Sequence, residues 1–207
     1  MLRPSRIPLF PLDVVLLPSM HLPLHIFEPR YKSMIARCLD EKIEFGMILA
    51  SNKSIATMGC TAEITRRIRD YPDGRLDIAT EGRAVFHLRE LLDEKEYYEA
   101  IVEYAEDETS VPNAGAQAEL EAQFEKCHLL LYGRPWMDAA RNQPETLSYH
   151  IAGLLPVELE KRQVLLEMRS ENARRELLLR WVAEFLPRLA DQQRMRQRAG
   201  GNGHGLN

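Results

Sequence analysis

The sequence predicts an α+β fold, in which a strand-rich first part with one inserted helix is followed by a helical second part. Apolar residues alternate with a period of two through most of the first hundred residues, as in half-buried strands. The stretch 106–117 is polar, and after it the apolar period becomes about 3.6, the period of a helix. We therefore expect a curled antiparallel sheet or small barrel over residues 1–110, a helical sub-domain over 111–198 and a flexible tail over 199–207.

The first part begins with two short apolar runs and a helix. Residues 7–12 and 14–17 are bounded by prolines, which occur at strand edges and ends, so both are predicted to be brief strands or extended connections. Pro29 then suits the first position of a helix. Behind it, apolar side chains follow the spacing of one buried helical face at Tyr31, Met34, Ile35, Cys38 and Leu39.

Further strands are predicted after this helix. Residues 45–49 alternate, and the run 62–69 places Ala62, Ile64 and Ile68 on a buried face, opposite Glu63, Thr65, Arg67 and Arg69. The sequence Tyr-Pro-Asp-Gly at 71–74 predicts a tight turn between two strands, because Pro restricts φ and Gly accepts a positive φ. Alternating runs at 86–88 and 100–104 supply two more strands.

Four helices are predicted in the second part. They cover 120–131, ended by Gly133, then 147–155, ended by Pro156, a short segment around 164–165, and 173–189. Pro187 should kink or end the last of them, because proline lacks the N–H that continues a helix.

Composition excludes several classes of protein. The 207 residues carry a net charge of -4, which disfavours general binding to nucleic acids. No apolar run approaches the roughly 20 residues that span a bilayer, and no signal-peptide core follows the N-terminus. The three cysteines are far apart in the sequence, as in reduced cytoplasmic proteins. We expect a cytoplasmic protein without a membrane anchor.

Common catalytic signatures are absent from the sequence. No glycine is followed by lysine, so there is no phosphate-binding P-loop, and the usual zinc-protease and hydrolase motifs are missing too. His21, His25 and Cys38 could be grouped as metal ligands, but packing or surface roles are favoured because zinc normally takes four closely spaced ligands. We expect no catalytic residue, no cofactor and no metal.

Aromatic residues are the candidates for partner contact, since their rigid rings supply contact area. They are Tyr71, Tyr97, Tyr98 and Trp136, with core packing left open as the alternative. Arg66, Arg67 and Arg69 precede Tyr71, a combination also found in nucleic-acid platforms. Strict alternation would place Arg67 and Arg69 on the face opposite Arg66, so a solvated strand face is favoured.

A set of short motifs points to a known family. They are Phe10-Pro11-Leu12, Leu17-Pro18, His25-Ile26-Phe27-Glu28-Pro29-Arg30-Tyr31, Phe45-Gly46, Gly59-Cys60-Thr61-Ala62-Glu63-Ile64, Asp73-Gly74-Arg75 and Glu81-Gly82-Arg83. In this order they closely resemble the N-terminal domain of Lon proteases, also found in cereblon and certain RING-finger proteins. The run I-F-E-P-R-Y is more similar to the stand-alone and RING-linked branch. A weaker match continues through residues 160–167.

The resemblance implies a six-stranded PUA-like pseudo-barrel followed by a helical bundle. In Lon this domain helps to capture substrates, whereas the ATPase and the Ser-Lys protease lie downstream, beyond the length of this sequence. We therefore expect a non-catalytic module that recognises unfolded protein segments or a dedicated protein partner, in an oligomeric state that the sequence leaves open. RNA binding through the PUA-like barrel is the alternative. An enzyme using His21, His25 and Cys38 is a third and weaker hypothesis.

Overall fold

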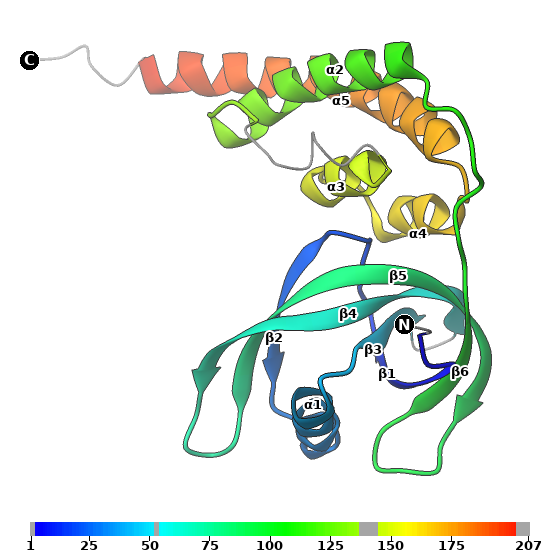
Figure 1. Ribbon diagram of the computed structural model, residues 1–207. Helices are drawn as coiled ribbons and strands as arrows, with labels where there is room; N and C mark the ends of the chain where they lie inside the picture. Colours follow the sequence, from blue (N-terminus) through cyan, green and yellow to red (C-terminus); the bar gives the residue numbers. More distant parts are fainter. Residues whose placement is uncertain (1–2, 52–53, 137–144, 202–207) are drawn as a thin grey trace, which may run out of the picture. The chain divides into compact units, whose positions relative to one another are not determined.

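The computed structural model describes residues 3–51, 54–136 and 145–201 (Figure 1). Within these ranges it contains a six-stranded sheet and five helices, so the predicted α+β class is confirmed. The chain divides into two compact units, formed by residues 1–108 with 152–169 and by residues 109–151 with 170–207. Among the described residues, no helix combines the length and the apolar character needed to cross a membrane.

The first unit contains the whole sheet. Its strands are β1 (Arg6–Leu12), β2 (His21–Ile26), β3 (Phe45–Ser51), β4 (Ser54–Asp70), β5 (Leu76–Leu92) and β6 (Glu99–Tyr104). The strand order is β2-β5-β4-β3-β1-β6, and β5 also pairs with β6. Five strands therefore form a closed ring of pairings, while β2 pairs with β5 and with no other strand of the described residues. Among the strand pairs of the described residues, β1 with β3 is the one parallel pair.

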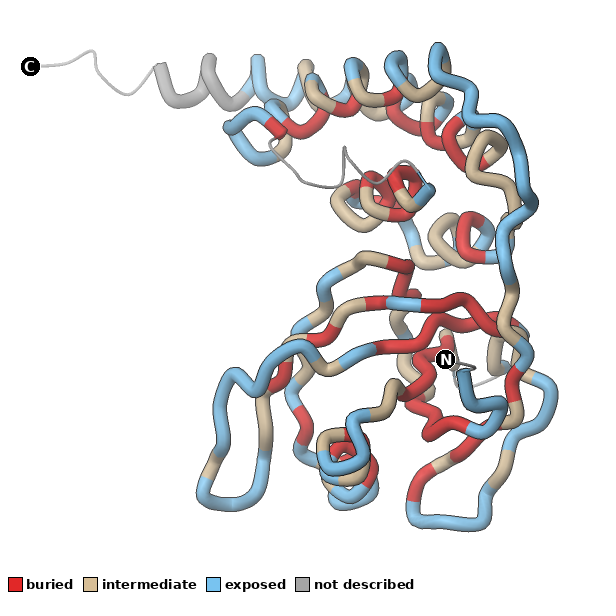
Figure 2. The backbone as a smooth tube through the Cα atoms, viewed as in Figure 1, coloured by how far each residue is buried: buried red, intermediate tan, exposed pale blue. Residues whose placement is uncertain are grey.

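The ring encloses an apolar core, and Figure 2 shows buried residues on its strands and exposed residues at the tips of its hairpins. One cluster consists of Ile7, Leu9, Ile48, Phe86, Ala100 and Val102. Phe86 fits because Gly59 has no side chain: a Cβ there would lie 2.6 Å from the Phe86 ring and 2.4 Å from the Met47 carbonyl oxygen. Glycine thus makes room for a close approach that any side chain would prevent.

The inserted helix α1 (Pro29–Glu41) confirms the sequence prediction. Pro29 stands in its first turn, and four of the five predicted apolar side chains are buried, whereas Leu39 is half-buried. The helix ends where Lys42 takes a left-handed conformation with φ 53° and donates its N–H to the carbonyl of Cys38.

The structure decides one strand prediction and corrects another. Residues 14–17, predicted as a brief strand or an extended connection, form a connection, and most of it is buried. In β4, register shifts separate Ile64 from Arg66 and Arg67 from Arg69, because bulges insert extra residues. Ile68 is consequently 48% exposed, and not on the buried face. In this register Arg66 lies opposite Ala79 and Arg69 lies opposite Asp77, which places both arginines on one face of β4 and Arg67 on the other face. Strict alternation had instead grouped Arg67 with Arg69.

The segment 152–169 belongs to the first unit, whereas the sequence grouped it with the helical part. It contains α4 (Leu159–Glu167), which packs on β4. The amide of Gln163 donates to the carbonyl of Met58, at 3.2 Å, and the Arg169 guanidinium donates to the carbonyl of Ala105, at 3.3 Å. These contacts join segments that are far apart in the chain, so periodicity could not reveal them.

The second unit is built on α2 (Ala114–Tyr132) and α5 (Glu171–Gly201), which pack together. Helix α3 (Leu147–Leu154) begins in this unit. Gly133 ends α2 with φ 68°, as predicted. Helix α5 does not end at Pro187 but continues to Gly201, since one missing backbone hydrogen bond does not terminate a long helix. Three residues of the predicted tail, 199–201, are thus helical, and 202–207 lie outside the described residues.

Candidate functional site

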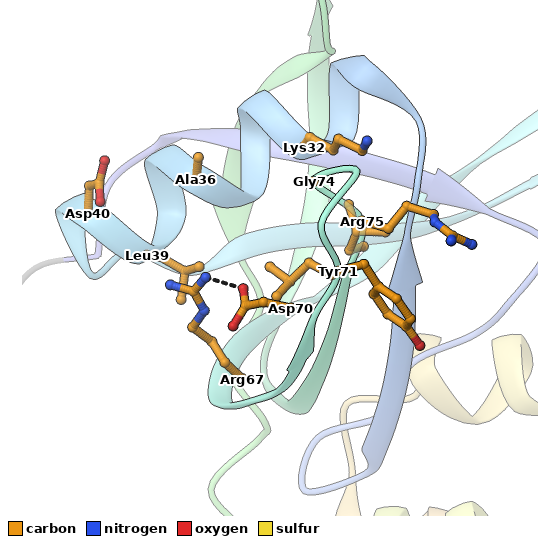
Figure 3. Close-up of a pocket in the computed structure, with 11 residues that line it drawn as sticks. Lys32, Ala36, Leu39, Asp40, Arg67, Asp70, Tyr71, Gly74 and Arg75 are labelled. Carbon is orange, nitrogen blue, oxygen red and sulfur yellow. Dashed lines mark hydrogen bonds and ion pairs between the residues drawn. The ribbon is translucent and has the colours of Figure 1, made fainter.

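A cleft of about 340 Å³ lies between α1 and the turn that joins β4 to β5 (Figure 3). We call it the Tyr71 cleft. Its lining residues are Ile26, Lys32, Ala36, Leu39, Asp40, Arg67, Asp70, Tyr71, Gly74, Arg75 and Leu76. The apolar members come from α1 and from the strands β2 and β5, whereas the charged members stand mostly at the rim. Arg67 and Asp70 form an ion pair across one end of it (Figure 3).

The turn has the geometry that its sequence predicts. Gly74 adopts φ +78° and donates its N–H to the Tyr71 carbonyl at 2.9 Å. The Tyr71 N–H donates to the carbonyl of Arg75 at 3.0 Å, which closes the hairpin. A backbone hydrogen bond from Arg75 lowers the pKa of Asp73 below its ordinary value. Lys32 of α1 donates to the Asp73 carbonyl at 3.0 Å, so helix and turn are tied together across the cleft.

Tyr71 is held in place by a small polar network. Its hydroxyl donates to Asp77 Oδ2 at 2.8 Å, and Asp77 Oδ1 lies 2.5 Å from Nδ1 of His25. The hydrogen bond with His25, and then the one with Tyr71, lowers the pKa of Asp77, while the contact with Asp77 raises the pKa of Tyr71. The guanidinium groups of Arg69 and Arg75 lie 4.7 and 4.9 Å from the ring centroid. Their positive charge interacts with the ring electrons.

An exposed aromatic side chain adjoins this network. Phe27, which follows β2, is 58% exposed and stacks on His25 with ring centroids 5.9 Å apart. The edge of His25 meets Tyr71 at 5.7 Å. Aromatic rings and guanidinium groups that lie together beside a cleft are suited to hold apolar or aromatic side chains of another chain. No reacting group is required for such binding.

The other predicted contact residues are placed differently. Tyr97 is 7% exposed, and its hydroxyl accepts a hydrogen bond from Arg37 at 3.3 Å. Tyr98 is half-buried and packs against the apolar cluster of the ring. Trp136, in the second unit, is 2% exposed, and its ring lies 4.8 Å from that of Phe124. For these three residues the packing alternative agrees with the observed burial, and only Tyr71 lines the cleft.

Two other residue groups suggested by the sequence do not form a site among the described residues: the possible metal ligands His21, His25 and Cys38, and the arginine run 66–69. Burial raises the pKa of the Cys38 thiol to about 12, and His25 is bonded to Asp77. Within the described ranges, no three histidine, cysteine or acidic side chains are grouped so that they could hold a metal ion. The arginine run is divided between two faces of β4, and Arg67 is neutralised by Asp70.

The cleft also contains residues that the sequence did not suggest as contact residues. Lys32, Ala36 and Leu39 come from α1, about forty positions before the turn. The i, i+4, i+7 spacing of these three places them on one side of a helix, a signal that was available. Nothing in the sequence, however, indicated that this side faces the β4–β5 turn.

Comparison with known proteins supports the resemblance found in the sequence. A family model described as the ATP-dependent protease La (LON) substrate-binding domain matches residues 6–184. The Lon protease of Escherichia coli strain K12 is 29% identical over 213 residues, which cover 93% of this chain and 26% of that protein. Lon protease 1 of Hydrogenovibrio crunogenus is 24% identical over 200 residues, which cover 90% of this chain and 24% of that protein. The chain thus spans about a quarter of the length of these curated relatives.

Solved structures show the same similarity. A Lon N-terminal domain protein from Xanthomonas campestris superposes with a TM-score of 0.67 at 26% identity, covering 86% of this chain and 98% of that one. The N-terminal domain of a Mycobacterium avium complex Lon protease gives a TM-score of 0.63 at 16% identity over the same shares, which indicates a common fold. Because the family model covers most of its length, the chain belongs to the LON substrate-binding domain family.

Proposed function

We propose that this chain is a recognition module for protein substrates, which holds exposed polypeptide segments in the Tyr71 cleft and is not itself an enzyme. The observation that carries the proposal is a cleft with apolar and charged lining, beside a fixed aromatic ring on the same hairpin, in a chain of a substrate-binding family. The curated relatives are proteases, but the match is to their substrate-binding domain. We further propose that the closed ring is a PUA-like pseudo-barrel, that the second unit is a helical bundle and that the protein is cytoplasmic.

The chemistry of the cleft indicates the kind of segment that it would hold. Leu39 and Leu76, which are half-buried, offer apolar surface, and burying an apolar side chain of the substrate there would favour binding. Tyr71 needs little further ordering, because Asp77 already holds its hydroxyl. We therefore infer a preference for segments with large apolar or aromatic side chains, which folded proteins keep buried and unfolded proteins expose.

The RNA alternative has less support from the site. Arg83 pairs with Glu63 and Glu81, just as Arg67 pairs with Asp70. Cations that are already paired contribute little to phosphate binding, because a phosphate must displace their carboxylates. A labelled RNA in the binding assay below, titrated at several salt concentrations, measures this alternative directly.

The proposal is tested by fluorescence anisotropy of dye-labelled unfolded casein titrated with the purified protein, with and without ATP. We expect saturable binding that ATP does not change, and no cleavage of casein on a gel. Tyr71→Ala removes the ring beside the cleft and should weaken binding about tenfold, the effect of a typical contact residue. Tyr71→Phe keeps the ring and should bind within about twofold of the unchanged protein.

A matched control separates the cleft from a general effect of losing a tyrosine. Tyr132 on α2 is 48% exposed, so Tyr132→Ala should leave casein affinity unchanged. Thermal unfolding of each variant shows whether it is folded. Equal affinities for Tyr71→Ala and Tyr132→Ala would exclude the cleft as the binding site. Cleavage of casein by the purified chain would contradict the proposal that it is not an enzyme.

A further inference from the structure

Strand β2 is an edge strand of the sheet. It pairs with β5 along its whole length, from His21 opposite Glu81 to Ile26 opposite Leu76, and this register has no shift. Among the described residues no other strand pairs with it. In Figure 1 it lies beside β5 and leads toward α1. Its second edge therefore presents backbone groups that no strand of the described chain satisfies.

The residues that form this open edge follow from the hydrogen bonds near the start of β2. The N–H of Gly82 donates to the carbonyl of Met20 at 3.0 Å, so the Met20 carbonyl points toward β5. The Thr80 hydroxyl donates to the carbonyl of Leu22 at 2.7 Å, which agrees with that direction. In an antiparallel pair the direction alternates along the strand. The backbone groups of His21, Pro23 and His25 consequently point away from β5.

From His21 to His25 every side chain of β2 is exposed or half-buried. The side chains of His21, Pro23 and His25 are exposed on one face. Leu22 and Leu24, on the other face, are only half-buried, although they point to the apolar side of the sheet. A strand placed next to β2 would cover these two leucines with every second side chain. The edge thus offers both hydrogen bonds and apolar contact.

The pattern of donors and acceptors indicates which partner fits. The edge carries the N–H groups of His21 and His25 and the carbonyls of His21, Pro23 and His25. These partial charges alternate with the spacing of an extended chain and are complemented by the backbone of another extended chain. A second copy of β2 is a poor match, because an antiparallel pair centred on Pro23 would oppose two prolines without an N–H between them.

We propose that β2 accepts an extended segment of unfolded polypeptide as an additional strand, with apolar side chains of that segment over Leu22 and Leu24. This inference rests on the proposed recognition of protein substrates and specifies how the backbone is held. Backbone hydrogen bonds would make the binding tolerant of sequence, while the leucines and the adjacent Tyr71 cleft would favour apolar side chains. Pro23 limits the number of hydrogen bonds and protects the edge from permanent pairing.

Amide hydrogen exchange of the full chain, resolved by residue with NMR, tests the proposal with unfolded casein as the probe. The amides of His21 and His25 should exchange at least about tenfold more slowly when casein is saturating, as expected for a newly formed ladder. The amides of Leu22 and Leu24 face β5 and serve as internal controls that are already protected. Saturable casein binding without protection of His21 and His25 would overturn the edge proposal and leave the recognition function standing.

Two outcomes have a different meaning. Failure of casein to bind at all would remove both proposals. Protection of His21 and His25 that appears on raising the protein concentration without casein would identify a second copy as the occupant, and would overturn the assignment to unfolded polypeptide.

A substitution that adds a donor provides an independent check. Pro23→Val supplies an outward N–H at the centre of the edge and should tighten casein binding about fivefold, the effect of one net backbone hydrogen bond. His21→Pro removes an outward N–H and should weaken binding by about the same factor, whereas His21→Ala keeps the N–H and should not. If His21→Pro does not fold, Pro23→Val decides. Unchanged affinity in Pro23→Val would contradict the proposal.

Discussion

Removing the charge of Glu99 should destabilise the first unit strongly and in a pH-dependent way. The side chain of this β6 residue is only 3% exposed. Its carboxylate forms ion pairs with Arg6 at 2.6 Å, Arg37 at 2.6 Å and Lys95 at 3.0 Å. One carboxylate therefore joins the N-terminal strand, α1 and the β5–β6 connection. Burial alone would raise the pKa of Glu99, but the hydrogen bonds from these three cations outweigh it and lower the pKa to about 2.

The magnitude follows from the difference between the two pKa values. The pKa falls from an ordinary 4.5 to about 2 in the folded protein. At about 1.4 kcal/mol for each pH unit, the charged carboxylate contributes about 3 kcal/mol to the free energy of unfolding. Because the folded pKa is the lower one, this contribution is complete above about pH 5 and is lost as the pH falls toward 2.

Urea unfolding of the wild type and of Glu99→Gln at pH 7, 5 and 3 measures this effect. At pH 7 we expect the variant to be less stable by about 3 kcal/mol, since three cations lose their shared carboxylate. The deficit should shrink at pH 3. Glu103→Gln is the control: its pair with Arg89 is exposed on both sides, so it should cost at most about 1 kcal/mol. A deficit in Glu99→Gln that is below 1 kcal/mol, or equal at all three pH values, would refute the reasoning.

Two further predictions concern packing. A Cβ at Gly82 would lie 2.1 Å from the Leu17 carbonyl oxygen, so Gly82→Ala should destabilise by about 3 kcal/mol in thermal or urea unfolding. Gly115→Ala, in the exposed first turn of α2, should instead stabilise by up to about 1 kcal/mol, and equal effects of both would contradict the steric argument. All three cysteines are buried and have raised pKa values. A thiol reagent at pH 7.5 should therefore label none of them until the chain is unfolded. Rapid labelling of the native protein would contradict this burial.

Local structure was largely predictable from the sequence because it depends on neighbouring residues. Helix α1 begins at Pro29, where a missing N–H costs nothing, and its buried face follows the 3.6-residue period. The Gly74 turn and the Gly133 helix end both use a positive φ that glycine accepts without strain. Family membership was likewise predictable, since short motifs such as the one ending at Tyr31 are contiguous in the chain.

The site was only partly predictable. Tyr71 was selected as an aromatic residue beside a turn, and it does line the cleft. Tyr97 and Trp136 have the same chemistry and are buried, because whether an aromatic ring packs inside or faces solvent depends on neighbours that are distant in the sequence. Asp77 was not selected, since its role depends on His25, which β2 brings opposite it across the sheet.

The sequence by itself therefore determined the strand-then-helix order, the start of α1, the Gly74 turn, the Gly133 helix end and the family. The tertiary structure alone decided three further features: the bulges that separate Arg67 from Arg69, the docking of α4 onto β4 and the open edge of β2. Each of these arises from backbone hydrogen bonds or packing between segments that are far apart in the chain. Periodicity reports which face of a segment is buried, but not which other segment buries it.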